Sequence, residues 1–320
     1  MGVLVEADRL RKTFGSITAV DEISLTVSRG EVLGFLGPNG AGKSTTMKML
    51  TGFLEPDGGS ARICGIAMAE RPKDAKSCIG YLPEGAPAYG EMTPRSFLGF
   101  VAEMRGYSGD SRGARVHAAI MRTGLQDVID QRIETLSKGF KRRVGIAQAI
   151  LHDPPVLIMD EPTDGLDPNQ KHHVRHLIAE MSRDKAIIVS THILEEVEAV
   201  CTRAVIIDKG RIVADGTADD LQRRLDYHNS VAIRVDEAVT SDVVAALEGF
   251  TNVQRIDRRA VGEGQVLLHA IAREGTAIAG EVTARLSERR IAIHEVYVER
   301  GKLDDVFRQI TSQEGRGTHA

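Results

Sequence analysis

Short apolar runs separated by glycines and polar turns fill the first two thirds of the chain. Two of them, Val156–Met159 and Ala186–Val189, are continuous instead of alternating, which is typical of parallel strands covered by helices on both faces. Residues 88 to about 150 are predicted to be mostly helical, with Thr93 as the first helix cap. Further strands are predicted at 4–10, 17–27, 32–36 and 80–82, and a hairpin at 205–213. The pattern predicts an α/β domain with a central sheet and a helical subdomain.

The pattern changes near residue 230, where strands and helices begin to alternate. Strands are predicted at 231–235, 253–257, 266–271 and 291–298, and helices at 242–247, 276–288 and 304–311. This order indicates a small α+β domain of the split βαβ, ferredoxin-like kind. The predicted organisation is therefore a first domain over 3–220, a polar linker over 221–229, a second domain over 230–312 and a flexible tail over 313–320.

Length and composition agree with two domains, because 320 residues exceed the size at which one core usually keeps growing. No run approaches 18 consecutive apolar residues, and the start has no secretory pattern, so we expect a cytoplasmic protein that does not span a membrane by itself. A net charge of −4 and a pI near 6.2 argue against nucleic acid as the main partner. Three scattered cysteines suit a reducing compartment.

The strand at 32–36 leads directly into a complete phosphate-binding loop. Its glycines let backbone N–H groups face phosphates, Lys43 reaches the outer phosphates, and Ser44 places a hydroxyl on Mg²⁺ at the start of a helix over 45–50. The loop consists of Gly37, Pro38, Asn39, Gly40, Ala41, Gly42, Lys43, Ser44 and Thr45. The sequence therefore predicts binding of a nucleoside triphosphate with Mg²⁺.

A second nucleotide element is the strand that ends in Asp160-Glu161. In such folds this strand lies beside the phosphate loop, so Asp160 is predicted to hold Mg²⁺, largely through water, and Glu161 to activate the attacking water as general base. A solvated turn is the alternative for an acidic pair taken alone. The phosphate loop upstream favours the catalytic interpretation.

The segment 136–144, Leu-Ser-Lys-Gly-Phe-Lys-Arg-Arg-Val, resembles the signature motif of ABC-type ATPases, usually LSGGQ. The resemblance continues through 161–168, which is similar to the D-loop of that family, and through Ser190-Thr191-His192, which is similar to its switch histidine. It covers about residues 3 to 220. The family implies a P-loop NTPase fold of the ABC type that binds and hydrolyses ATP.

The resemblance also implies roles for individual residues. Two ATP molecules would lie between two ATPase subunits, with Ser137, Lys138 and Gly139 of one facing the phosphates bound by the other, and Asp167 in the D-loop nearby. His192 would hold the γ-phosphate and the attacking water. Phe14 stands where the family stacks an aromatic on adenine; a core phenylalanine is the alternative. A homodimer on ATP binding and a membrane permease docked near residues 84–135 follow as expected partners.

The sequence departs from the family pattern at three positions. Glu84 replaces the glutamine that touches Mg²⁺ and water, so Mg²⁺ binding should survive while the extra charge alters hydrolysis. Lys138 replaces a glycine and adds charge near the partner's phosphates, and Phe140 replaces a glutamine. The basic run 141–143 is interpreted as helix-surface charge, and His172, His173 and His176 as a solvated face with no metal.

Within the family, the segments 80–84, 208–216 and 302–307 most resemble ATPases of bacterial multidrug, gliding-type and copper-processing exporters. The implied function is ATP hydrolysis that energises an exporter, at the inner face of the membrane through the permease. A soluble ABC ATPase of translation or DNA repair, a regulatory module with weak hydrolysis and an importer subunit are the alternatives. The cargo is not encoded in an ATPase subunit.

Overall fold

The computed structural model describes residues 2–86, 88–262, 264–273 and 276–313. It divides between Asp215 and Gly216 into two compact units, each of which has its own core. The predicted end of the first domain, residue 220, lies beyond this boundary. The predicted tail falls almost entirely on 314–320, which lie outside the described residues.

The first unit contains a six-stranded sheet in the order β10-β9-β3-β8-β7-β6. Its strands are β3 (Val32–Leu36), β6 (Ile79–Leu82), β7 (Val156–Asp160), β8 (Ala186–Thr191), β9 (Arg203–Asp208) and β10 (Arg211–Gly216). The pairs β3/β8, β3/β9, β6/β7 and β7/β8 are parallel. The predicted central strands and the hairpin at 205–213 are thereby confirmed.

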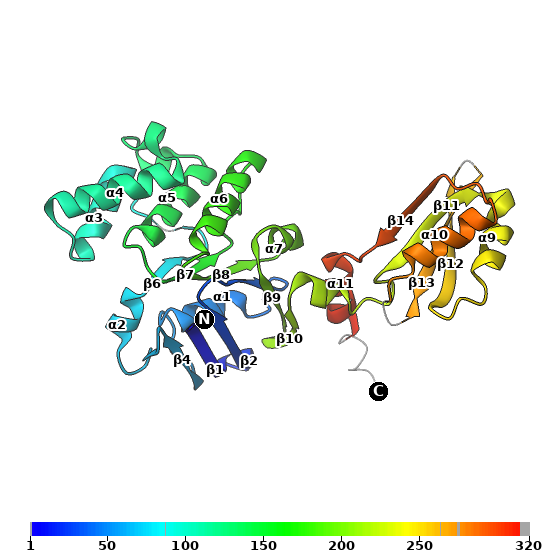
Figure 1. Cartoon of the computed structure of the whole chain (residues 1–320). Helices are drawn as coiled ribbons and strands as arrows, with labels where there is room; N and C mark the ends of the chain where they lie inside the picture. The colour runs from blue at the N-terminus through cyan, green and yellow to red at the C-terminus, as the bar shows by residue number, and fades with distance from the viewer. Residues whose placement is uncertain (1, 87, 263, 274–275, 314–320) are drawn as a thin grey trace. The chain divides into compact units, whose positions relative to one another are not determined.

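The continuous apolar runs are explained by two separate cores, one on each face of this sheet. On β7, Leu157 and Met159 pack into a cluster with the helices, whereas Val156 and Ile158 pack into a cluster with the antiparallel sheet. Figure 1 shows the two layers on opposite sides of β6, β7 and β8. A strand covered on both faces needs apolar side chains at every position.

An antiparallel sheet in the order β2-β1-β4-β5 covers one face together with α1 (Lys43–Leu50). Its strands are β1 (Val3–Phe14), β2 (Ile17–Ser28), β4 (Gly58–Ile63) and β5 (Ile66–Ala67), and α2 (Pro72–Ser77) follows. The other face carries α3 (Pro94–Met104), α4 (Gly109–Thr123), α5 (Lys138–Ile150) and α6 (Pro168–Met181), with short 3₁₀ turns at Gln126–Val128 and Ile133–Thr135. Helix α7 (Leu194–Val200) follows β8. Thr93 caps α3 as predicted, since its hydroxyl accepts from the Ser96 N–H.

The second unit has a four-stranded antiparallel sheet in the order β12-β13-β11-β14, the arrangement expected for a split βαβ fold. Its elements are β11 (Ser230–Asp236), α9 (Thr240–Leu247), β12 (Val253–Gly262), β13 (Gln265–Ala272), α10 (Ala279–Glu288) and β14 (Glu295–Glu299). One face of β11 and β13 packs with α9 and α10 around Val231, Leu268 and Val282. Helix α11 (Leu303–Gln313) ends the described chain.

The stretch expected to be a polar linker is a structured part of the second unit, so that expectation was wrong. Its first residues, 221 and 222, belong to α8 (Ala218–Gln222), whose N-terminus Thr217 and Asp220 close with a capping box. Leu221 and Leu225 are buried, and the Tyr227 hydroxyl donates to Asp305 on α11. The segment contains few apolar residues, but these are spaced so that they reach one surface.

Candidate active site

The phosphate loop follows β3, where the structure leaves room only for glycine at key positions. A Cβ on Gly37 would lie 2.5 Å from the Ile207 carbonyl oxygen, and one on Gly42 would lie 2.4 Å from that of Ala19. Gly40 and Gly42 also have φ of +82° and +106°, which side chains rarely adopt. The loop therefore brings its backbone close to whatever it binds.

Helix α1 begins at Lys43, two positions before the helix start that the sequence suggested. The Lys43 Nζ donates to the carbonyl oxygens of Gly37 (2.7 Å) and Pro38 (3.0 Å), so the ammonium lies inside the loop. Ser44 stands in the first turn, where N–H groups have no intrahelical partner. This geometry suits an anion, since the helix dipole adds to the lysine charge.

Asp160 ends β7 and is 1 % exposed. The register pairs it with Ser190 on β8, whose hydroxyl donates to its Oδ1. The Oδ2 atom is buried and accepts no hydrogen bond from the described residues. A buried carboxylate oxygen without a donor is costly, and a hydrated Mg²⁺ near Ser44 would satisfy it. Asp160 therefore fits the predicted metal site, although no three metal-binding side chains of the described chain converge on one point.

Glu161 follows Asp160 in a left-handed conformation with φ of +52°, which is unusual for a glutamate. Its N–H donates to the Ser190 hydroxyl at 3.1 Å, and its Oε1 lies 2.9 Å from the His192 Nδ1. Burial raises the pKa of Glu161, while the His192 contact opposes this rise. A base with a raised pKa that is held by a second group suits proton abstraction from water.

A cavity of about 430 Å³ joins these elements. Its lining residues are Phe14, Ala19, Asn39, Gly40, Gly42, Lys43, Ser44, Thr45, Glu84 and Glu161. Phe14 is 49 % exposed, so the alternative of a core phenylalanine is wrong, and its ring is available to a base. Glu84 reaches the cavity from the loop after β6. The structure thus brings four separately predicted parts of the sequence, Phe14, the phosphate loop, Glu84 and Glu161, together around one cavity.

The signature residues do not line this cavity. Ser137 is exposed at the N-terminus of α5, and its Oγ accepts from the Phe140 N–H at 3.3 Å. Gly139 packs closely against α6, because a Cβ there would lie 2.2 Å from the Gln170 Oε1, so that this side chain would have to move. Asp167 caps α6 by accepting from the Gln170 N–H at 2.9 Å. Within one chain, these residues therefore hold the ends of two helices.

Lys138 is engaged within its own chain. Its Nζ donates to the Asp164 carboxylate at 2.8 Å, and its stem lies against Gly165, where a Cβ would approach its Cδ to 2.4 Å. The Lys138 contact lowers the pKa of Asp164. The extra signature charge is thus paired with the D-loop in this state.

The basic run 141–143 is not a surface patch, contrary to the sequence interpretation. Arg142 is 4 % exposed, and its guanidinium donates to the Pro83 carbonyl oxygen at 3.3 Å. Arg143 is half-buried and donates to the Gly124 carbonyl oxygen at 2.9 Å. Helical spacing could have indicated this, since Gly139, Arg142 and Ile146 share the buried face of α5.

Glu196 is a second residue that the sequence reasoning missed. It is 4 % exposed, and its carboxylate accepts from the hydroxyls of Thr163 and Thr191, the latter at 2.9 Å. Lys171 lies 3.6 Å away. Because Thr163 follows Glu161 closely and Thr191 precedes His192, this buried acid ties together the two segments that carry the catalytic pair.

Comparison with known proteins decides the family. The family model described as "ABC transporter" matches residues 20–164. Nod factor export ATP-binding protein I of Paraburkholderia xenovorans is 34% identical over 97% of this chain and 97% of its own length. The chain belongs to the ABC transporter family. Linearmycin resistance ATP-binding protein LnrL of Bacillus subtilis is 30% identical over 97% of this chain and 99% of its own. This ABC protein is accordingly an ATP-binding, ATP-hydrolysing subunit of a transporter.

Solved structures agree with the fold of this ABC ATPase. An ATP-binding subunit of an ABC transporter is 34% identical, with a TM-score of 0.64 over 69% of this chain and 92% of that chain. A dimeric ATP-binding cassette bound to ADP and Pi has the same fold, with a TM-score of 0.63 over 67% of this chain and 98% of that chain at 22% identity. Each of these two structures matches a part of this chain about as long as the first unit.

A further solved structure, cbiO1 of Clostridium perfringens, is described as part of the ABC transporter complex cbiONQ; it is 27% identical, with a TM-score of 0.63 over 70% of this chain and 92% of that chain. In the described part of the chain, none of the helices has the length and apolar character that crossing a membrane requires.

Proposed function

We propose that this chain energises an exporter: ATP binding closes a pair of ATPase subunits, and hydrolysis reopens it. The names of the relatives support this direction of transport, because they describe linearmycin resistance and Nod factor export, and a further relative of Escherichia coli is named a probable multidrug transporter ATP-binding protein. We place the chain on the cytoplasmic face of the membrane, held there by the permease. These relatives favour this function over translation, DNA repair or import.

The single observation that carries the chemical part is the convergence of Lys43, Glu84 and Glu161 on one cavity. Lys43 would bind the outer phosphates, and Phe14 would stack on the adenine. Mg²⁺, held by Ser44, Asp160 and Glu84, would supply charge stabilisation at the phosphates. Glu161 would accept the proton of the attacking water, with His192 keeping its carboxylate oriented.

A second copy of the chain completes the site in this proposal. Ser137 is exposed at the N-terminus of α5, and the first N–H groups of this helix, that of Gly139 included, have no intrahelical partner, which suits the γ-phosphate bound by a partner. Lys138 would then have two anions within its range, Asp164 of its own chain and the partner's ATP. Asp167 is the N-cap of α6, shortly after Glu161 in sequence, and would face the partner's phosphate loop.

The permease would dock on the helical subdomain. A groove of about 310 Å³ lies between α1, β6, α3 and α5, and a cavity of about 530 Å³ lies beside Tyr89 and Phe100. Phe53, Tyr89 and Met104 are exposed by 76 %, 59 % and 73 %, unusually high values for large apolar side chains. The lining residues of the groove are Lys48, Phe53, Tyr81, Pro83, Val101, Arg105, Gln148 and Ala149. This apolar surface fits an amphipathic element of a membrane subunit.

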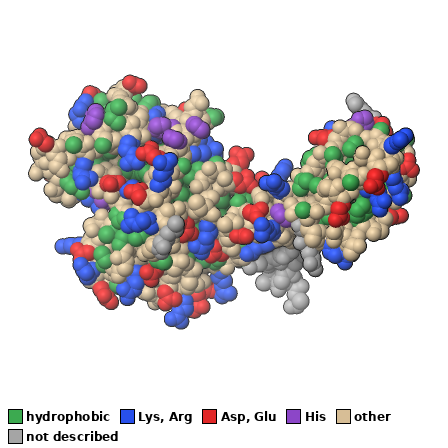
Figure 2. All heavy atoms as spheres, viewed as in Figure 1, with side chains coloured by type: hydrophobic (Ala, Val, Ile, Leu, Met, Phe, Trp, Pro, Cys, Tyr) green, Lys and Arg blue, Asp and Glu red, His purple; other side chains and the backbone are tan. Residues whose placement is uncertain are grey.

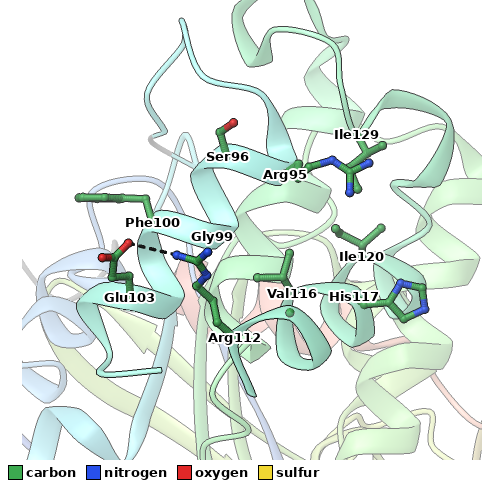
Figure 3. A pocket seen from close by; sticks show the side chains of 11 residues that line it. Arg95, Ser96, Gly99, Phe100, Glu103, Arg112, Val116, His117, Ile120 and Ile129 are labelled. Carbon is green, nitrogen blue, oxygen red and sulfur yellow. Dashed lines mark hydrogen bonds and ion pairs between the residues drawn. The ribbon is translucent and has the colours of Figure 1, made fainter. Parts of the chain in front are cut away.

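A further cavity of about 450 Å³ lies between α3 and α4. Figure 3 shows Arg112 and Glu103 paired on one side of it, with Val116 and Ile120 to the right of this pair. We include it in the permease surface because Phe100 borders both this cavity and the one beside Tyr89. By contrast, basic and acidic side chains are interspersed over the visible face of the first unit (Figure 2), which offers no continuous track for nucleic acid.

The test is to trap and identify the complex. Tagged Glu161→Gln chain, expressed in its native cells and held with ATP, should co-purify from solubilised membranes with a polytopic protein and a second copy of the chain. A second variant, Phe53→Asp with Glu161→Gln, should still dimerise with ATP but lose the membrane protein. Recovery with ribosomes or DNA, or a monomer at saturating ATP by light scattering, would contradict the proposal.

A further inference from the structure

Arg142 is a buried cation that lies between two loops of the nucleotide site. From α5 it donates to the Pro83 carbonyl oxygen at 3.3 Å, next to Glu84 in sequence. On its other side, its Nη2 lies 4.0 Å from the Asp164 carboxylate. A single side chain, 4 % exposed, thus contacts both the loop that carries Glu84 and the loop that follows Glu161. Neither contact belongs to the cavity lining described above.

The surroundings of Arg142 are strongly acidic. Burial lowers its pKa, and the carboxylates of Asp164, Asp160, Glu161 and Glu84 oppose that change. Three of these, Glu161, Asp160 and Glu84, act on Lys43 in the same way. Lys43 lines the cavity, whereas Arg142 is not among its lining residues. An arginine stays charged when buried, so it can offset them permanently.

The loop after β6 is packed tightly against the helix that carries Arg142. One turn farther along α5, a Cβ on Gly145 would lie 2.6 Å from the Leu82 Cδ1 and 2.8 Å from the Ala86 Cβ. Ala86 itself has φ of +45°, a conformation that costs energy for alanine and persists only when the surroundings impose it. The position of Glu84 therefore depends on what α5 holds in place.

The charge of Glu84 makes this support necessary. A glutamine there would leave two carboxylates, Asp160 and Glu161, beside the phosphates; Glu84 adds a third. ATP without Mg²⁺ brings four more negative charges, and unit charges about 8 to 10 Å apart near a protein surface change affinity by about tenfold each. Lys43 is one buried cation at this site, and a second one is needed to offset the third carboxylate.

We propose that Arg142 is a positioning residue that balances the charge of Glu84 and fixes the 83–86 loop on α5, so that a third carboxylate can stand at the phosphate site. The same guanidinium, with Lys138, holds Asp164 and so links this loop to the segment after Glu161. The inference rests on the proposed position of Glu84 at the nucleotide site. It goes beyond that proposal by identifying Arg142 as the cation that offsets the negative charge of Glu84.

The experiment is a double-mutant cycle on Arg142→Gln and Glu84→Gln, read by ATP affinity in EDTA and by thermal unfolding. Arg142→Gln should weaken Mg²⁺-free ATP binding about tenfold, Glu84→Gln should strengthen it, and the double variant should return to within about threefold of the wild type. In thermal unfolding, Arg142→Gln should lower the Tm of the wild type. In the Glu84→Gln background the same substitution should lower Tm by less than about half of that amount, because the carboxylate that Arg142 balances is absent.

Two further variants make the cycle specific. Lys141→Gln removes one charge from the same helix, but its Nζ contacts the Glu134 carbonyl oxygen, so ATP affinity should change less than about twofold. Arg142→Lys keeps the charge and should keep ATP affinity. If Arg142→Gln does not fold, Glu84→Gln and Arg142→Lys still test the idea.

Additive Tm changes in the cycle, or an Arg142→Lys variant that loses as much ATP affinity as Arg142→Gln, would overturn the proposal for Arg142. An unchanged Mg²⁺-free affinity in Glu84→Gln alone would instead overturn the place of Glu84 at the site. The two failures are therefore distinguishable.

Discussion

Glu196→Ala is expected to destabilise the first unit and slow hydrolysis at the same time. The substitution removes the acceptor of two hydroxyl groups, those of Thr163 and Thr191, which are 3 % and 0 % exposed. Neither donor gains water in exchange, so each loses a hydrogen bond to a charged acceptor, worth about 1.5–3 kcal/mol. The loss of the Lys171 contact adds little because that side chain is partly exposed.

The expected cost in unfolding free energy is therefore about 3–5 kcal/mol. For a unit of this size, 1 kcal/mol shifts Tm by about 2–4 °C, so Tm should fall by roughly 10 °C. Glu196→Gln should cost less than half of this, because its amide keeps one acceptor oxygen. Since Thr191 precedes His192, kcat should also fall about tenfold at a temperature where the variant is folded, with KM for ATP changed less than about threefold.

The assay is calorimetry together with steady-state ATPase kinetics. Glu195→Gln is the matched control, because Glu195 is the preceding residue on α7 and is exposed; its Tm should stay within about 1–2 °C of the wild type. A Glu196→Ala protein that melts within about 2 °C of the wild type would refute the reasoning that this carboxylate satisfies buried donors.

Two further predictions concern pH. Burial raises the pKa of Glu161 from 4.5. Because the protonated acid cannot accept a proton, kcat/KM should fall on the acid side with an apparent pKa above 4.5. An apparent pKa at or below that value in a pH–rate profile would disprove this. Burial lowers the pKa of His152 from 6.5 to about 4. The folded state thus favours the neutral imidazole. The free energy of unfolding is unaffected by His152 above pH 6.5 and should fall by up to about 2 kcal/mol as the pH decreases toward 4. Urea unfolding at several pH values should show this slope, and His152→Gln should flatten it.

The phosphate loop and Asp160-Glu161 could be predicted from the sequence because each depends on a local rule, whereas His192 was implied by the family resemblance. Glycines permit the turn after β3, and a buried parallel strand delivers whatever follows it to one edge of the sheet. The pairing of Leu36 with Thr191 and of Asp160 with Ser190 then brings three separate segments together. The apolar runs predicted the strands, and the structure supplied their register.

The contacts that support this site could not be placed in the same way. Arg142 and Lys141 are neighbours with similar side chains, and only the packing of α5 on the 83–86 loop buries one of them. On α7, the neighbours Glu196 and Glu195 differ in the same way, since Glu196 is buried and Glu195 is exposed. The pairing of Lys138 with Asp164 joins residues far apart in sequence, and no local pattern encodes such a distance.

By itself, the sequence determined the nucleotide chemistry, the family and the two-part α/β and α+β organisation, because these depend on short motifs and on hydrophobic period. Only the tertiary structure decided which charges are buried, which acids are paired, and that the expected linker 221–229 packs through Leu221, Leu225 and Tyr227 within the second unit. Burial and pairing depend on which surfaces meet. A charged side chain acquires its role from the low-dielectric surroundings that other segments provide.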